Sequence, residues 1–88
     1  MARIQVTDEE IELAVNKVRS MLEGRLRQKG KGTFASTHEI YGVIAEEFDE
    51  LGDELRNNNS EAFKNELMDI AVGAIFGVAC IDAMKTDW

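Results

Sequence analysis

The stretch from Leu67 to Ile81 constrains the fold most, because it is apolar on nearly every side of the helix that its periodicity predicts. A helix at the surface of a small domain has one apolar stripe, so this one must be covered on several faces. The stretch is too short to span a bilayer comfortably, and Asp69 interrupts it near its start. It therefore predicts a buried helix.

Three helices and no strand are expected in this chain of 88 residues. Proline is absent, and breaks that contain glycine or asparagine separate segments with helical rather than alternating periodicity. We predict one domain with helices over 7–28, 37–56 and 60–84 and a loop over 29–36. Because two helices can hardly cover the third, the predicted fold is an all-α, three-helix protomer that completes a helical bundle by oligomerisation.

Local signals support these boundaries. Thr7 with Glu10 and Ser36 with Glu39 have the spacing of capping boxes, and Ser60 or a preceding asparagine is expected to cap the third helix. One apolar face of each of the first two helices is expected to be buried: Ile11, Val15, Val18, Leu22 and Leu26, and then Ile40, Ile44, Phe48, Leu51 and Leu55.

Two glycines in the third predicted helix, Gly73 and Gly77, are spaced to allow another backbone to approach closely. The approaching helix belongs either to the same chain or to a neighbouring subunit. We favour the neighbouring subunit, because the apolar helix needs more cover than one chain supplies.

The formal net charge of −7 argues against nucleic acid and against an anionic membrane as partners, because both require a basic surface. The lone Cys80 lies in the apolar stretch and is interpreted as a buried free thiol in a reducing compartment. The start, MARIQVTDEE, lacks the pattern of a signal peptide. We therefore expect a cytoplasmic protein.

Two acidic pairs, Glu47/Glu50 and Glu66/Asp69, interrupt the second and third predicted helices. Residues three apart lie on the same face of a helix. A short connection at 56–60 favours antiparallel packing, and both pairs lie at similar distances from it, so the four carboxylates are expected to converge. A single pair of this kind is usually a solvated face, but two pairs mirrored about a turn weaken that alternative.

Converging carboxylates repel one another, so a cation is expected between them. Oxygen ligands without histidine or cysteine favour Mg²⁺, with Mn²⁺ as an alternative. A ferritin-like di-iron site requires Glu-x-x-His pairs, and the only histidine, His38, lies far from the third helix. Such an ion would polarise a phosphoryl oxygen and activate water, and it would make the acidic protein compatible with a triphosphate.

The segment EEFDE at 46–50, followed by ELMD at 66–69, resembles the EExxE…ExxD signature of the MazG-like nucleotide pyrophosphohydrolases, an all-α superfamily. The resemblance covers about half the chain, 37–81. It implies Mg²⁺-dependent cleavage of a (d)NTP to a (d)NMP and pyrophosphate by a helical dimer or tetramer. It implies that Glu47, Glu50, Glu66 and Asp69 are metal ligands and that Glu46 orients water or a second metal ion.

This chain departs from the pattern at Met68, where family members often have glycine, and it ends soon after the third helix, where many relatives continue. Both departures bear on pocket shape and substrate preference. The cover that a longer chain provides is expected to come from other subunits.

Substrate contacts are expected from the basic residues in and before the loop, since they would meet phosphates if the loop folds over the site. These are Arg25, Arg27, Lys29 and Lys31. Phe34 is the preferred residue for stacking on a base, ahead of Tyr41 and Trp88, and Asn65 would hydrogen-bond a base or sugar. His38 is given no role. For each of these residues a surface or packing role is the alternative.

A second interpretation belongs to another class of protein, a non-catalytic acidic helical module for oligomerisation or regulation. Its apolar third helix would be the functional surface, and the carboxylates would be incidental or would bind a stabilising metal ion. The intact acidic pairs count against it.

Overall fold

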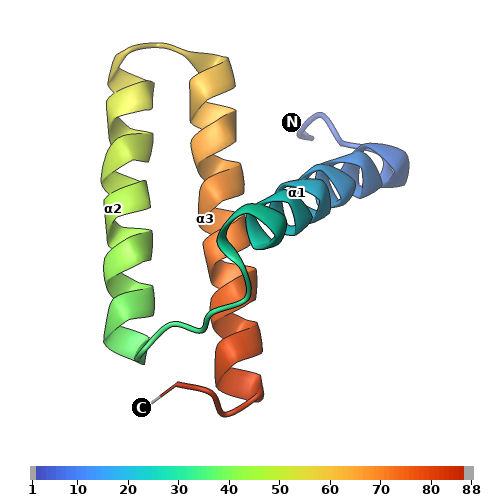
Figure 1. Ribbon diagram of the computed structural model, residues 1–88. Coiled ribbons are helices and arrows are strands. Elements are labelled where there is room, and N and C mark those ends of the chain that lie inside the picture. The colour runs from blue at the N-terminus through green and yellow to red at the C-terminus, as the bar shows by residue number, and fades with distance from the viewer. Residues whose placement is uncertain (1, 87–88) are drawn as a thin grey trace.

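The computed structural model describes residues 2–86 and contains three α-helices, α1 (Asp8–Lys29), α2 (Thr37–Arg56) and α3 (Ser60–Asp82). Figure 1 shows α2 and α3 side by side and antiparallel, with α1 crossing α3 near its middle and projecting away from the pair. Residues 2–86 contain no strand. The all-α, three-helix prediction is confirmed.

The helix starts follow from their caps. Thr7 and Glu10 form the predicted capping box, with the Thr7 amide donating to Glu10 Oε1 at 2.8 Å and the Glu10 amide donating to Thr7 Oγ1 at 3.1 Å. Asn59 caps α3 by accepting from the Ala62 amide. The second capping box is only half formed.

At the start of α2, the Ser36 hydroxyl accepts from the Glu39 amide at 3.2 Å, as predicted. The Glu39 carboxylate, however, accepts from the Ala35 amide at 2.7 Å, one residue earlier than a capping box requires. Ser36 therefore caps the helix while Glu39 fastens the end of the preceding loop.

The third helix ends at Asp82, two residues before the predicted end. Met84 takes a left-handed backbone conformation, with φ of 56°, which no helical residue has. Its amide donates to Ile81 O, and the Lys85 amide donates to Cys80 O, both at 2.9 Å. This pair of bonds is a Schellman motif, which closes a helix by satisfying its last carbonyls.

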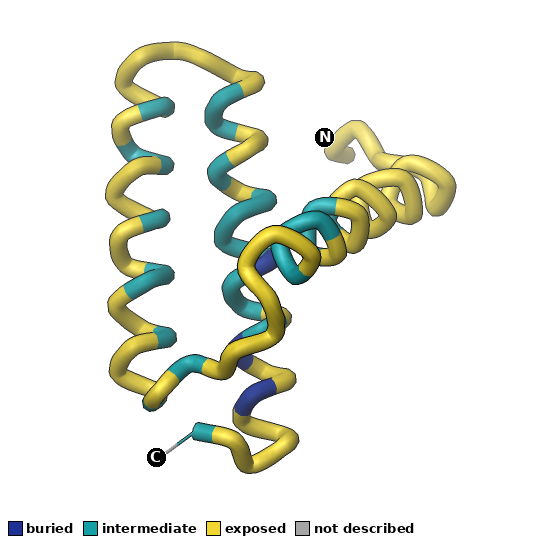
Figure 2. Tube along the Cα trace, viewed as in Figure 1, coloured by how far each residue is buried: buried dark blue, intermediate teal, exposed yellow. Residues whose placement is uncertain are grey.

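The core of the protomer is very small. Its buried apolar side chains are Val72 and Cys80, which are 6% and 3% exposed, and both lie on α3. Cys80 is a free buried cysteine, as predicted. Neither α1 nor α2 contributes a fully buried residue, and Figure 2 shows the buried positions confined to α3.

The predicted buried stripes are wrong in part. On α2, Phe48 and Leu55 are 66% and 67% exposed, and on α1, Ile11 and Val15 are exposed. The half-buried face of α2 includes Glu47 with its apolar neighbours, because that face packs on α3. The first half of α1 is exposed because it extends beyond the other helices (Figure 2).

The chain exposes more surface than a compact monomer. Its accessible area is 7039 Å², whereas a folded monomer of 9.9 kDa exposes about 5,200 Å². Its radius of gyration is 15.0 Å, against about 12 Å for a compact domain of this length. The excess area is apolar in large part, since α3 alone exposes Leu67, Ile75, Val78 and Ile81.

The packing of α2 on α3 within one chain explains why position 77 is glycine. A Cβ built at this residue would lie 3.0 Å from Cγ2 of Ile40 on α2, so glycine permits α2 and α3 to approach closely. Gly73 faces Ile44 at an ordinary contact distance of 3.9 Å. The alternative that we favoured less, a close crossing inside one chain, therefore explains Gly77, whereas the contact at Gly73 would also accommodate alanine. No helix among residues 2–86 is long and apolar enough to cross a membrane.

Candidate metal centre

Three of the predicted metal ligands come together between α2 and α3. Glu47 of α2 and Glu66 and Asp69 of α3 each offer a carboxylate oxygen, and these oxygens lie within 4.8 Å of one another. The three-residue spacing places Glu66 and Asp69 on one face of α3, and the antiparallel packing brings Glu47 opposite them. The three side chains are half-buried.

The other two acidic residues of the motif lie at the edge. Glu50 is exposed, but it is near enough to Glu66 for that negative charge to be the main cause that raises the pKa of Glu50. Glu46 is exposed on α2 and lies outside the group of Glu47, Glu66 and Asp69. Because consecutive helical residues point about 100° apart, Glu46 and Glu47 cannot face α3 together.

Burial raises the pKa of both Glu47 and Glu66. For Glu47, desolvation is the largest cause; the hydrogen bond with Glu66 lowers its pKa, and the negative charges of Asp69 and Glu50 raise it. Desolvation also raises the pKa of Glu66 most, followed by its hydrogen bond with Glu47 and the charge of Asp69. A cation among these groups would favour their ionised forms.

The geometry is compatible with a small divalent cation. Ligands of octahedral Mg²⁺ are about 4.1 Å apart when opposite and about 2.9 Å apart when adjacent, so oxygens up to 4.8 Å apart need to close in by up to about 2 Å, which is within the reach of a change in side-chain rotamer. Glu66 Oε2 is buried and has no hydrogen-bond partner among the described residues, which leaves it available as a ligand. The donor set is oxygen alone, as hard cations require.

A basic side chain already contacts this group. Arg25 of α1 donates from Nη2 to Oδ1 of Asp69 on α3 and forms an ion pair with it. The positive charge of Arg25 lowers the pKa of Glu47, although by less than the causes that raise it. Asp69 therefore differs from Glu66, whose buried oxygen has no such donor.

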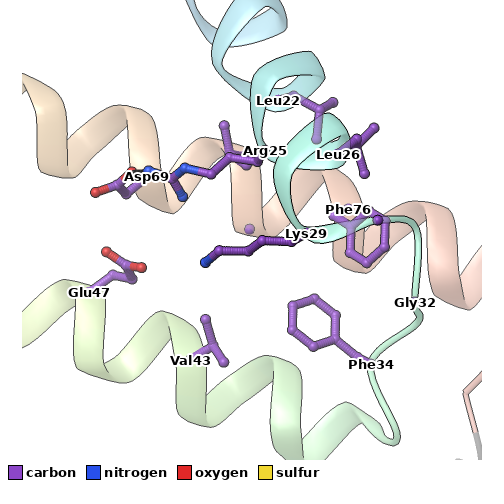
Figure 3. Close-up of a pocket in the computed structure, with 13 residues that line it drawn as sticks. Leu22, Arg25, Leu26, Lys29, Gly32, Phe34, Val43, Glu47, Asp69 and Phe76 are labelled. Atoms are coloured by element: carbon purple, nitrogen blue, oxygen red, sulfur yellow. Dashed lines mark hydrogen bonds and ion pairs between the residues drawn. The ribbon is translucent and has the colours of Figure 1, made fainter.

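A pocket of about 310 Å³ extends from the carboxylates to the loop between α1 and α2 (Figure 3). Glu47 and Asp69 stand at one end of it, and Arg25 and Lys29, one turn apart on α1, project between that end and the rest of the pocket. The remainder of the lining is apolar side chains and glycine: Leu22, Leu26, Gly30, Gly32, Phe34, Val43, Val72, Gly73 and Phe76.

Two phenylalanines form the end of the pocket away from the carboxylates. Phe34 of the loop and Phe76 of α3 contact edge to face, with ring centroids 5.6 Å apart and planes at 67°. The contact holds the loop against α3, and Figure 3 shows both rings beside the pocket, across from Val43. The pocket thus has an anionic end, a basic middle and an aromatic end.

The predicted substrate contacts divide between pocket and surface. Arg25, Lys29 and Phe34 line the pocket, whereas Arg27, Lys31 and Asn65 are exposed and do not border it. Tyr41 is exposed as well. Trp88, the third aromatic candidate, lies outside the described residues.

Sequence reasoning missed Phe76 and Val43 as pocket residues. Phe76 lies in the apolar stretch of α3, where its residue type indicates only burial. Val43 is one position from the predicted stripe of α2. Arg25 was expected as a substrate contact, and it lies four residues before Lys29 and therefore on the same face of α1.

Comparison of the chain with models of protein families, with curated proteins and with solved structures gives no match.

Proposed function

We propose that the chain is a Mg²⁺-dependent nucleoside triphosphate pyrophosphohydrolase that cleaves a (d)NTP to a (d)NMP and pyrophosphate. One observation carries the proposal, the order of groups along a single pocket. Carboxylates from two helices lie at one end, two basic side chains follow, and two aromatic rings lie at the other end. A metal-bound triphosphate with its nucleoside presents the complementary groups in that order.

In this proposal Glu47, Glu66 and Asp69 hold Mg²⁺, or Mn²⁺, and Glu50 joins them from the edge of the group. When bound, the ion polarises a phosphoryl oxygen and lowers the pKa of a bound water. Lys29 donates to the phosphates, and Phe34 and Phe76 contact the base. Glu46 remains a prediction from the motif alone.

Water is the second reactant in the proposed hydrolysis. A water oxygen forms a bond to the α-phosphorus, the bond between that phosphorus and the bridging oxygen breaks, and pyrophosphate leaves with that oxygen. One proton of the water passes to a base and then to solvent. The contribution of the chain is to hold the phosphates in line and to offer carboxylates that are anionic when a cation is among them.

The motif supports the same reaction. The segments at 46–50 and 66–69 resemble the EExxE…ExxD signature of MazG-like pyrophosphohydrolases, and three of its acidic positions converge. Met68, the departure from that pattern, lines a different hollow, between α1 and α3 beside Leu13 and Lys64. Met68 therefore lies where α1 packs on α3 and does not line the pocket.

We also propose that the protein works as a homo-oligomer, a dimer or a tetramer. The chain exposes about 1,800 Å² more than a compact monomer of its mass, and an obligate dimer buries about 1,000–2,500 Å² per subunit. Apolar residues on the outer side of α3 and on the first half of α1 supply this surface.

The test is a panel of canonical and modified (d)NTPs incubated with Mg²⁺, with pyrophosphate and orthophosphate measured separately. Pyrophosphate in equal amount to the monophosphate supports the proposal. Orthophosphate alone means a different phosphatase reaction, and no product from any triphosphate rejects the enzyme. Glu66→Gln is the matched inactive control, since it keeps the shape of the side chain.

The exposed apolar surface favours a second candidate, a non-catalytic module that assembles with copies of itself or binds a regulatory partner. For such a module, Glu66→Gln leaves the assembly state and the function in the cell unchanged. For the enzyme, the same substitution removes turnover while the assembly state is retained.

A further inference from the structure

The ion pair between Arg25 and Asp69 places a basic side chain at the anionic end of the pocket. It joins α1 to α3, whereas Asp53 with Arg56 and Glu61 with Lys64 pair three residues apart on one helix. The side chains of Arg25 and Asp69 are 36% and 19% exposed, so the pair is partly open to water and contributes modestly to stability. Its position requires another explanation.

Arg25 also borders the part of the pocket in which the phosphates of a triphosphate would lie. It lines the pocket together with Lys29, between the carboxylates and the aromatic end (Figure 3). A guanidinium bound to Asp69 takes one oxygen of that carboxylate and repels a second cation nearby. A phosphate that reaches the carboxylate end meets the same guanidinium, and guanidinium groups bind phosphate oxygens in pairs.

We propose that Arg25 is a positioning residue that stays paired with Asp69 until a divalent cation and a triphosphate are both present. The Arg25 guanidinium then leaves Asp69 and donates its hydrogen bonds to a phosphate oxygen instead. The proposal rests on the proposed function for the identity of the two ligands. Its consequence is regulatory. The cation alone binds weakly because it competes with Arg25, and the phosphate removes that competitor.

This exchange couples the two ligands. If a triphosphate releases Asp69 for the cation, the cation must favour the triphosphate by the same factor, because binding free energies are reciprocal. The site then binds free Mg²⁺ weakly and binds the ion more tightly together with the phosphates. A residue that only fastens α1 to α3 gives no such coupling.

The experiment measures Mg²⁺ binding by calorimetry to the wild type, Arg25→Met and Arg27→Met. It is done with Mg²⁺ alone, and then with a non-hydrolysable α,β-imido nucleoside triphosphate at saturating Mg²⁺. Arg27 is the matched control, because it carries the same charge on the same helix but does not border the pocket. Circular dichroism and a melt verify that each variant is folded.

We expect Arg25→Met to bind Mg²⁺ alone about tenfold more tightly than the wild type, as for the loss of a close charge pair. We expect it to bind the Mg²⁺–analogue complex at least about tenfold more weakly. Arg27→Met should differ from the wild type by less than about twofold in both titrations. Mg²⁺ affinity in Arg25→Met that falls, or that equals the Arg27→Met value, overturns the proposal.

These outcomes are separate from turnover. If the wild type hydrolyses no triphosphate but the two Arg25→Met shifts are found, the proposed function is wrong and the exchange is correct. If neither protein binds Mg²⁺, both are wrong. A measurement on the wild type guards against a variant that does not fold. The NMR signal of the Arg25 guanidinium should change when Mg²⁺ and the analogue are added, and an unchanged signal at saturation contradicts the exchange.

Discussion

Neutralising Glu66 should stabilise the metal-free protein, although most substitutions at half-buried positions destabilise. Glu66 has carboxylate neighbours within 4.8 Å on both helices, Glu47 and Asp69, and its Oε2 has no donor among the described residues. In Glu66→Gln the repulsion disappears and the new amide N–H can donate to either neighbour. Asp69 is a poorer choice, since its charge is paired with Arg25.

The expected gain in stability is calculated from the distance between the carboxylate charges. Two unit charges 4.8 Å apart repel by about 0.9 kcal/mol in water and by about 3.5 kcal/mol at an effective dielectric constant of about 20. Because these side chains are half-buried and remain partly open to water, a value near the lower figure applies to each of the two neighbours, and Arg25 offsets part of the sum. Glu66→Gln should therefore stabilise the metal-free protein by about 1 kcal/mol, which raises Tm by about 4–8 °C.

The assay is a thermal melt in chelator and again in millimolar Mg²⁺. The wild type should gain Tm on adding Mg²⁺, because a ligand of the folded state stabilises it by mass action, and Glu66→Gln should not. Glu61→Gln on the same helix is the control. Its charge is paired with Lys64 in the first turn of α3, so its loss should lower Tm slightly. A Glu66→Gln variant that melts below the wild type in chelator refutes the like-charge account.

Three further outcomes are expected. Three clustered glutamates, Glu47, Glu50 and Glu66, have raised pKa values, so the metal-free protein should lose stability as pH rises above about 4.5 through those values. The gain in Tm on adding Mg²⁺ should grow over the same pH range. Equal gains in Tm at about pH 5 and about pH 7.5 contradict this. Gly77→Leu should lower the free energy of unfolding, measured in urea, by about 2 kcal/mol or more, because a Cβ at this position meets Ile40 Cγ2 at 3.0 Å. Gly42→Ala, whose Cβ would have nothing within 4 Å, should raise it by about 0.5–1 kcal/mol. Phe34→Ala should raise KM for a nucleoside triphosphate about tenfold and leave hydrolysis of inorganic triphosphate unchanged; an equal effect on both excludes a base contact.

The helix caps and the turn between α2 and α3 were predictable because each depends on residues that are close together in the sequence. The Thr7 capping box, the asparagine cap of α3 and the antiparallel turn at 57–59 each depend on a few consecutive residues. The end of α3 was missed because Met84 takes a left-handed conformation that methionine rarely adopts, so its residue type gives no warning. The same locality explains why Glu66 and Asp69 were correctly placed on one face.

The position of α1 was not predictable, and with it most of the pocket. The sequence shows that Arg25 and Lys29 share a face, but only the crossing of α1 over α3 directs that face toward Asp69. On α2 the apolar pattern misled, because Glu47 belongs to the packed face while Phe48 points outward. A polar residue in the packed face of a helix is a local inconsistency of the kind that functional sites show.

The central claim is that Glu47, Glu66 and Asp69 share one divalent cation. A crystal structure of the protein grown with Mn²⁺ and the non-hydrolysable α,β-imido nucleoside triphosphate tests it directly, because manganese is located by its anomalous scattering. We expect a single strong anomalous peak between α2 and α3, at bonding distance from oxygens of all three carboxylates. Fully occupied manganese elsewhere on the molecule, with these three side chains turned apart, would contradict it.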